Sequence, residues 1–522
     1  MRTVRADVAI IGGGLGACAA ALAAARLGRT VVVTEETRWL GGQLTSQAVP
    51  PDEHPWIEEA GATASYRALR QGIRAYYRAY LPLTAEARAR ERLNPGNGWV
   101  SPLCHDPRVS VAVLEQMFAP HRIGGRLTTL QPAEPQSAWT RGDAVAGVVV
   151  KDLESGNDIA IEAPFFIDGT PHGDLLALAG VEHVLGAESS AQTGEPHAAE
   201  RADPLDQQAV TVCFAMEHLP GEDHTIDRPR QYERWRALRP PGWPGPLLGW
   251  TTSRPETHEP LTRFLFEAHD AHPWWTFRRI LDRTQFEGGF APSDVTVVNW
   301  PQNDYWFGPV VGVDPAERAR NLDAARQLSL SLLHWLQTEA PRPDGGVGYP
   351  GLRLRGDVVG GTADGLAPAP YVREGRRIRA EFTVLEQHIA HPLRPDGPER
   401  FADSVGVGWY RIDLHPRVSG AGYIDLGCWP FQIPLGALIP VRVENLLPGG
   451  KALGVTQITN GAFRVHPVEW TVGEAAGVLT AFCLGRRVPP RAVRHDGRLL
   501  AEYQALLRDQ GVELAWSSLA PL

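Results

Sequence analysis

The segment Asp7-Val-Ala-Ile-Ile-Gly-Gly-Gly-Leu-Gly-Ala17 decides the fold of this chain. Its first part, Asp7–Ile11, is a short apolar run that predicts a buried parallel strand. The helix predicted after it, Leu15–Leu27, is rich in alanine and leucine and stops at Gly28. Thr30–Thr34 is β-branched throughout and predicts a second strand. A strand, a helix and a strand within about 30 residues make a βαβ unit.

The turn between this strand and helix has the spacing G-x-G-x-x-G/A. Gly12 permits the tight turn, Gly14 lets the backbone touch a pyrophosphate, and Ala17 lets the helix pack closely on the sheet. Leu15 and Gly16 begin the helix, where free N–H groups and a partial positive charge favour phosphates. The segment therefore predicts a dinucleotide-binding site.

An acid stands at the end of the second strand. Glu35 follows Gly12 by 23 residues, close to the roughly 20 that precede the ribose-binding acid in dinucleotide folds. Its carboxylate can accept hydrogen bonds from both ribose hydroxyls, and it would repel a 2′-phosphate, which disfavours NADP. Glu36 is assigned to the same site.

The loop after this acid favours FAD over NAD. Gly41-Gly42 resembles the flavoprotein pattern in which this loop runs under the ribityl chain towards the isoalloxazine. Gln43, just beyond, is placed to hydrogen-bond the flavin or the substrate. Near the C-terminus, Glu444–Leu453 and Ala462–Pro467 precede a helix that contains Gly473–Gly477. Small residues at a helix start would let N–H groups approach the flavin pyrimidine, where reduction leaves negative charge.

Further stretches of one known pattern run almost from end to end. They are Leu40–Ser46, Ile167–Leu175, Asn299–Trp306, Asp364-Gly365, Pro370–Ile378, Tyr410–His415 and Ile433–Leu435. Taken together they resemble the bacterial FAD-dependent oxidoreductases whose paralogues are often labelled xanthan-lyase-like, with a glutathione-reductase-type FAD fold. The resemblance implies bound FAD. Few substrates are assigned in that family, so it implies the cofactor better than the reaction.

One departure from the family is the turn Asp168-Gly169-Thr170, where relatives read Asp-Ala-Thr. Glycine fits the same turn, so the fold is expected to survive. Asp168 either contacts the ribityl chain or orders the loop beneath it, or it merely caps the segment Leu175–Ala179. The residues assigned to FAD are Gly12, Gly14, Leu15, Gly16, Ala17, Glu35, Glu36, Gly41, Gly42, Gln43, Asp168, Gly169, Gly450, Arg464, Ala476 and Gly477.

Oxidation of an alcohol or amine at a flavin needs a base for the donor's proton and a positive group near the reduced ring. If His415 ends a strand, it shares a face with Asp413, as base and orienter or as a structural pair. His466 either meets the flavin, acts as the base, or caps the helix that follows. Arg373, with Tyr371, either binds an acidic or hydroxylated substrate or forms a structural ion pair. The candidate catalytic residues are thus His415, His466 and Arg373.

Three other features each have a functional and a structural interpretation. Asp304 lies among aromatic residues in the sequence. In its functional interpretation it binds the substrate. Most of the 16 tryptophans fall in the middle of the chain, where they either stack on sugar rings and flat ligands or pack the core. Cys104 is either redox-active beside the flavin or a buried, inert thiol.

Composition excludes several classes of function. The 522 residues are 43% hydrophobic with a net charge of -9, so no positive field attracts nucleic acid. Five scattered cysteines without CxxC indicate neither a disulfide framework nor a zinc site, and suit the reducing cytoplasm. The apolar N-terminus is explained by the βαβ unit, and no later run of 18 apolar residues predicts a membrane span. No metal site is expected.

We expect an α/β protein with a discontinuous Rossmann-type FAD-binding domain, residues 1–185 and 435–522, and an inserted α+β substrate domain, residues 186–434. The expected reaction is hydride removal from a small or medium organic substrate, an alcohol or amine, sugar-like ones included, with transfer to oxygen or another acceptor. The alternatives are an NAD(P)H-reduced flavin monooxygenase and a binding or scaffold protein with FAD but no turnover. A small molecule is the expected partner, and a homodimer stays open.

Periodicity and breakers predict the remaining elements. Helices are expected at Ala64–Tyr80, Ala85–Arg92, Val109–Met117, Glu259–His269, Ala316–Gln337, His466–Leu484 and Leu499–Gln510. Strands are expected at Gly125–Leu130, Ala144–Val150 and Glu162–Ile167.

Overall fold

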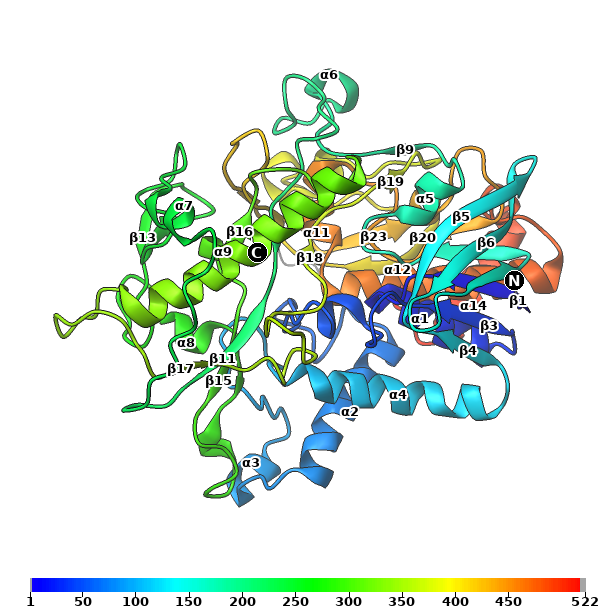
Figure 1. The fold of residues 1–522 in the computed structure, drawn as a ribbon. Helices are drawn as coiled ribbons and strands as arrows, with labels where there is room; N and C mark the ends of the chain where they lie inside the picture. Colours follow the sequence, from blue (N-terminus) through cyan, green and yellow to red (C-terminus); the bar gives the residue numbers. More distant parts are fainter. Residues whose placement is uncertain (1, 517–522) are drawn as a thin grey trace.

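A five-stranded parallel sheet carries the N-terminal motif in the computed structural model, which describes residues 2–516 (Figure 1). Its strand order is β24-β8-β2-β3-β4, and all neighbours are parallel. The strands are β2 (Val8–Ile11), β3 (Val31–Thr34), β4 (Leu127–Leu130), β8 (Phe165–Asp168) and β24 (Leu446–Pro448). All but β4 are buried along their whole length, which explains their continuous apolar sequences.

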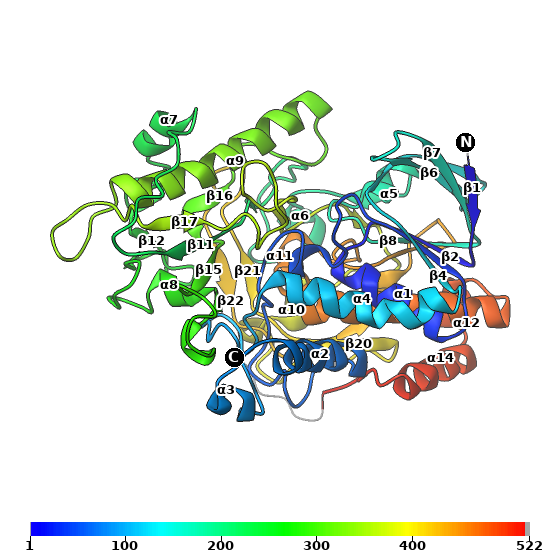
Figure 2. The same ribbon diagram turned by 60° about the horizontal axis from the view of Figure 1, so that its bottom comes forward.

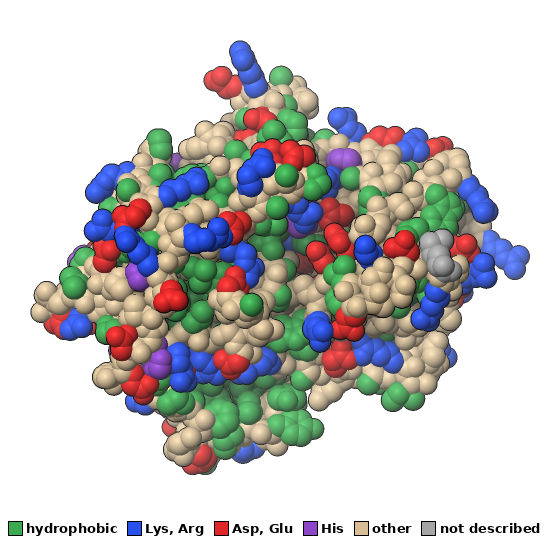
Figure 3. Space-filling view, in the orientation of Figure 1, with side chains coloured by type: hydrophobic (Ala, Val, Ile, Leu, Met, Phe, Trp, Pro, Cys, Tyr) green, Lys and Arg blue, Asp and Glu red, His purple; other side chains and the backbone are tan. Residues whose placement is uncertain are grey.

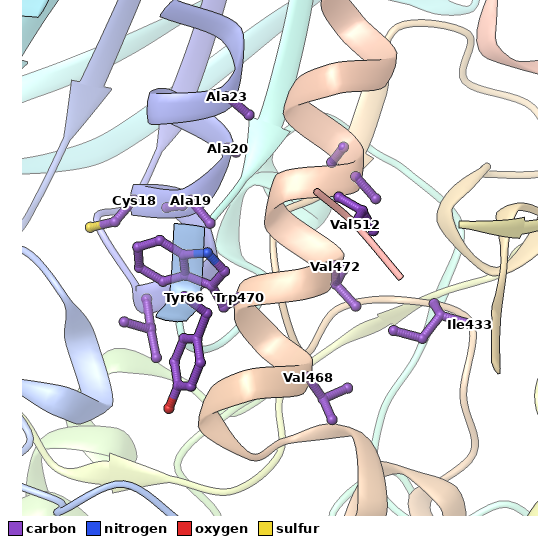
Figure 4. Packing of buried hydrophobic residues seen from close by; sticks show 14 of the residues in the cluster. Cys18, Ala19, Ala20, Ala23, Tyr66, Ile433, Val468, Trp470, Val472 and Val512 are labelled. Carbon is purple, nitrogen blue, oxygen red and sulfur yellow. The ribbon is translucent and has the colours of Figure 1, made fainter. Parts of the chain in front are cut away.

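Two helices pack against each other on one face of this sheet. They are α1 (Leu15–Arg26) and α12 (His466–Arg486), and Figure 4 shows the small side chains of α1 turned towards α12. A Cβ on Gly473 would collide with the carbonyl of Gly16, and one on Gly477 with the carbonyl of Ala20. Glycine and alanine on the contact face therefore let the two backbones approach closely.

A second sheet covers the opposite face. It has the order β1-β7-β6-β5, formed by β1 (Arg2–Arg5), β7 (Asp158–Glu162), β6 (Ala144–Asp152) and β5 (Ala133–Arg141). Its apolar side chains form one cluster with those of β2 and β8. On the other side, α4 (Pro107–Ile123) packs on α1 and α2 (Ala64–Tyr80) packs on α4 (Figure 2).

Residues between Ala209 and Val372 build a separate apolar core. Its sheet has the order β14-β15-β11-β17 and is covered by the long helix α9 (Pro315–Thr338). Seven tryptophans pack inside it: Trp235, Trp250, Trp274, Trp275, Trp300, Trp306 and Trp335. Core packing is thus the role of these tryptophans, the structural one of the two interpretations.

The other elements are short. The helices are α3 (Ala85–Ala89), α5 (Asp174–Leu178), α6 (Ser190–Thr193), α7 (Tyr232–Ala237), α8 (Trp274–Phe277), α10 (Glu386–Ile389), α11 (Gln457–Phe463), α13 (Pro490–His495) and α14 (Gly497–Asp509). The strands are β9 (His183–Val184), β10 (Val210–Thr211), β11 (Phe214–His218), β12 (Thr251–Ser253), β13 (Pro260–Thr262), β14 (Arg279–Leu281), β15 (Val295–Val298), β16 (Asp304–Tyr305), β17 (Leu352–Leu354), β18 (Tyr371–Val372), β19 (Arg377–Ile378), β20 (Ser404–Gly408), β21 (Ile412–Leu414), β22 (Ile424–Leu426) and β23 (Phe431–Pro434). The single-turn 3-10 helices are η1 (Gly42–Leu44), η2 (Arg283–Gln285), η3 (Pro301–Asn303), η4 (His391–Leu393) and η5 (Leu435–Leu438).

Most of the expected helices are confirmed within a few residues, but one expectation is wrong. The helix expected at Glu259–His269 is absent, and the segment instead forms β13 and a loop. Tertiary contacts outweigh its local preference, because the guanidinium of Arg263 lies over the rings of Trp274 and Phe277. The helix expected at Ala85–Arg92 ends at Ala89.

Charged side chains of both signs are interspersed over the face of the molecule drawn in Figure 3. Within residues 2–516, no helix combines the length and apolar character needed to cross a membrane.

Candidate active site

A cavity lies at the carboxyl ends of β2, β3, β8 and β24, where ligands bind in open parallel sheets. Its walls include Gly12 and Gly14 from the first turn, Glu35 from the end of β3, and Lys451 and Glu469 from the C-terminal segment. Four segments far apart in the chain therefore meet at one edge of the sheet.

The glycine turn leaves the first backbone amides of α1 without a hydrogen bond from a capping side chain. Gly12 has φ of +88°, and a Cβ there would collide with the backbone of Thr170. Gly14 is the N-cap residue and provides no side-chain cap, so the first amides of α1 face the cavity side without a capping oxygen. The backbone amide of Gly41, itself at φ +109°, donates to the carbonyl of Gly13 at 2.8 Å. The Gly41-Gly42 loop is thereby held against this turn.

Glu35 is fixed by three donors. Its Oε2 accepts from the amide of Gly13 at 3.0 Å, and its Oε1 accepts from the amide and hydroxyl of Thr37 at 2.8 and 2.7 Å. Burial raises the pKa of Glu35 to about 7, although these donors favour the ionised form. The carboxylate is thus positioned beside the glycine turn, whereas its neighbour Glu36 is exposed at the rim.

Glu35 makes the stability of the FAD-free protein depend on pH. Between pH 4.5 and about 7 the folded protein keeps a proton that the unfolded chain has lost, so stability falls as pH rises. The full effect is about 3 kcal/mol. We expect Glu35→Gln to reduce the loss of stability between pH 5 and 7.5 in urea unfolding, while Glu86→Gln, on the surface of α3, leaves that loss unchanged; Glu195, whose pKa burial also raises to about 7, keeps part of the slope in both variants. Equal slopes in wild type and Glu35→Gln would contradict this assignment.

Asp168 acts within its own loop. Its Oδ1 accepts from the amide and hydroxyl of Thr170 at 2.9 and 2.7 Å, and its Oδ2 accepts from the amide of Leu176 at 3.1 Å. These hydrogen bonds order the turn after β8 and the start of α5. Gly169 lines the cavity, and its carbonyl accepts from the amide of Gly14.

The opposite wall carries two charged residues that sequence reasoning missed. The Nζ of Lys451 is buried and donates to the carbonyl of Val372 at 2.8 Å, and burial lowers its pKa. The amide of Gln43 donates to the carboxylate of Glu469 and to the carbonyl of Arg464. One signal for Lys451 was present, because only two of the 51 basic residues are lysines. Nearly all basic positions of the chain are arginine, so a lysine at position 451 is unusual.

Arg464 lies beyond this wall rather than on it. Its guanidinium donates to the Asp413 carboxylate at 2.7 Å and to the Tyr371 hydroxyl at 2.7 Å. Burial opposes ionisation of Asp413, but His415 and Arg464 outweigh it and hold its pKa below the ordinary value. This group lies outside the cavity and connects to it through the carbonyl of Arg464, which accepts from the amide of Gln43.

His415 and the buried Asp304 form a pair of residues 111 positions apart in sequence. The Nδ1 of His415 lies 2.5 Å from the Asp304 carboxylate, which also contacts Thr211 and the Arg373 guanidinium, the latter at 3.0 Å. Burial opposes ionisation of Asp304, but Arg373 and His415 lower its pKa. The Nε2 of His415 is 3.6 Å from Asp413, so the two residues do lie on one side of β21. Arg373 is therefore the ion partner of Asp304.

His466 lies elsewhere. It is fully buried at the start of α12, where its Nδ1 accepts from the amide of Asp52 at 3.0 Å and its Nε2 lies 3.2 Å from the carbonyl of Val49. Burial lowers its pKa to about 4. The structure thus brings His415 and Arg373 together and places His466 against the loop that follows η1.

Ala476 and Gly477 are not at a helix start. The helix α12 begins at His466, ten or more residues earlier, so their amides belong to the regular helix and Gly477 packs on Ala20 of α1. Cys104 is fully buried, and burial raises the pKa of its thiol to about 12, which makes it an inert thiol.

The chain was compared with known proteins. A family model described as FAD dependent oxidoreductase matches residues 7–507. No curated protein matches the sequence. A geranylgeranyl bacteriochlorophyll reductase-like structure from Thermoplasma acidophilum is 9% identical over 98% of this chain and 85% of that chain, with a TM-score of 0.31. The OxyS anhydrotetracycline hydroxylase from Streptomyces rimosus is 11% identical over 97% of this chain and 66% of that chain, with a TM-score of 0.32. The L-proline dehydrogenase from P.horikoshii is 17% identical over 36% of this chain, which spans 24% of that protein's length, with a TM-score of 0.18.

Proposed function

The chain belongs to the FAD-dependent oxidoreductase family, and from this premise we propose that it oxidises a small or medium organic donor, an alcohol or amine, with sugar-like donors included. When bound, FAD supplies the hydride acceptor, and the electrons pass on to oxygen or another acceptor. The observation that carries the proposal is the His415–Asp304 pair, which polar contacts through Asp413 and Arg464 connect to Gln43 in the cavity wall.

The residues of the cavity fit FAD. The bare start of α1 suits the diphosphate, and Glu35 suits the adenosine ribose. Gln43 and Gln47 line the cavity, and each has a buried side-chain oxygen without a hydrogen-bond donor in the described protein. Such oxygens call for donors from a ligand, which the hydroxyl and imide groups of FAD provide. We assign Gly12, Gly14, Glu35, Gly42, Gln43, Gly169 and Gly450 to FAD.

Hydrogen bonds link residues that line the cavity to residues around the His415–Asp304 pair. Gln43 reaches from the cavity to the carbonyl of Arg464, and Lys451 reaches to the carbonyl of Val372. Arg373 follows Val372 directly and contacts Asp304. A donor placed between the cavity and His415 therefore meets polar groups from both sides.

In this proposal His415 is the base. Asp304 accepts the hydrogen of Nδ1, which fixes the tautomer, and Nε2, 3.6 Å from the Asp413 carboxylate, is the atom that takes the donor's O–H or N–H proton. Arg373 holds Asp304 ionised in its buried position. Arg464 and Tyr371 offer donors for a polar group of the substrate.

The proposal extends to the architecture. We propose that residues 186–434 form the substrate domain, inserted between the two parts of the FAD domain, residues 1–185 and 435–522. The separate core built by residues between Ala209 and Val372 supports such a unit. Membership of the xanthan-lyase-like branch, a small-molecule substrate as the partner, a cytoplasmic setting and assembly as a homodimer belong to the same proposal.

Anaerobic mixing of the holoprotein with a panel of sugars, polyols and amines tests the reaction. We expect at least one donor class to bleach the oxidised-flavin absorbance, while NADPH bleaches it slowly. Fast bleaching by NADPH alone would instead indicate a monooxygenase. A flavin that neither the panel nor NADPH reduces would indicate a protein that keeps FAD for structure.

A further inference from the structure

The carboxyl group of Glu469 lies where the diphosphate of FAD is expected to bind. Glu469 enters the cavity from the first turn of α12, and its Oε1 lies 3.7 Å from the position of a Cβ on Gly14. The same oxygen lies 2.7 Å from the position of a Cβ on Gly450. The carboxyl group therefore lies between the glycine turn before α1 and the glycine turn after β24.

The surroundings of Glu469 do not neutralise a negative charge well. Among residues 2–516, the amide of Gln43 is its hydrogen-bond donor, and no arginine, lysine or histidine forms an ion pair with it. Lys451 is the nearby cation, but its Nζ donates to the carbonyl of Val372 instead. From α1 the thiol of Cys18 faces the group, and Glu35 lies on the far side of the glycine turn.

Two negative groups at one helix start oppose each other. The diphosphate of FAD binds at the bare amides of α1, and an ionised carboxylate beside it would repel the phosphates in a site from which water is excluded. A carboxylic acid, in contrast, is neutral and can donate a hydrogen bond to an oxygen. We propose that Glu469 is a cofactor-binding residue that holds FAD as a neutral carboxylic acid.

In the FAD-free protein, the surroundings of Glu469 already favour its protonated, neutral form. Burial raises the pKa of Glu469, and this outweighs the opposing effects of Lys451 and the Gln43 amide. FAD binding raises the pKa further, because the diphosphate disfavours a second negative charge. FAD affinity therefore falls as pH rises above the pKa of Glu469 in the FAD-free protein, by up to tenfold per pH unit, or about 1.4 kcal/mol.

Infrared spectroscopy of the holoprotein at pH 8 tests the protonation state directly. We expect a carbonyl stretch of a protonated carboxylic acid in the wild type that is missing in Glu469→Gln. The control Glu134→Gln removes a carboxyl group that lines the same cavity and keeps the band. If Glu469→Gln instead loses a carboxylate stretch, the proposal is overturned.

FAD affinity between pH 6 and 9 gives a second readout. Glutamine imitates the neutral acid, so we expect Glu469→Gln to hold FAD with a dissociation constant that changes less with pH than that of the wild type and of Glu134→Gln. Parallel pH profiles in all three proteins would overturn the proposal. If Glu469→Gln does not fold, the wild-type holoprotein is measured at pH 8, where absence of the carboxylic-acid band overturns the proposal. Neither measurement uses the donor substrate, so the proposed reaction can fail independently.

Discussion

Replacing His415 with glutamine is expected to slow reduction of the bound flavin by the donor about 10²–10⁴-fold, with FAD content unchanged. Glutamine retains a hydrogen-bonding side chain of similar reach but cannot accept the donor's proton. The side chain of His415 is about one-fifth exposed, so the substitution leaves the core intact. Anaerobic stopped-flow absorbance with a donor found in the panel measures the rate.

A matched control is His197→Gln. His197 also pairs with a buried carboxylate, that of Glu386, but it lies outside the cavity and the Asp304 group. We expect this variant to keep the wild-type rate of flavin reduction. If His415→Gln also keeps that rate, His415 is a structural partner of Asp304 and another group takes the proton.

The second large expected effect is on the free energy of unfolding, and it comes from the contact between α1 and α12. We expect Gly473→Val to lower the free energy of unfolding by about 3 kcal/mol or more and to release FAD. The added side chain would collide with the backbone of Gly16, which no rotamer change can move aside. Because Gly16 belongs to the first turn of α1, separating the helices also displaces the amides that hold the diphosphate. Thermal unfolding and flavin absorbance after gel filtration measure the two effects.

Gly485→Ala in the same helix is the control. A Cβ there meets only the end of the Arg29 side chain, at 3.2 Å. The flexible guanidinium can move, and alanine favours a helix over glycine by about 1 kcal/mol. We therefore expect a small gain in stability with full FAD content. Equal losses in both variants would show that the α1–α12 contact is not the cause.

The dinucleotide-binding half of the site could be predicted from sequence because its parts are local. Gly12, Gly14 and Glu35 lie within one βαβ unit, where strand, turn and helix fix their relative positions. Glu469 and Lys451 could not be found in this way. They join the cavity only because α12 packs along α1, a contact between segments more than 400 residues apart.

The grouping of the candidate catalytic residues depends even more on tertiary contacts. Asp413 and His415 were predicted to share a face from strand periodicity, but Asp304 reaches His415 from another strand, β16. Local patterns do not specify such a pairing. The missed loop at Glu259–His269 has the same origin, since Arg263 packs on the rings of Trp274 and Phe277 and, far back in the chain, on Trp99.

The cofactor content of the purified protein tests most directly whether the cavity between Gly14, Glu35 and Glu469 holds FAD. Heat release followed by chromatography should give one FAD for each chain, and a protein stripped of flavin should take up the same amount again. Colourless protein that releases no flavin and takes up none on reconstitution would contradict the assignment of this cavity.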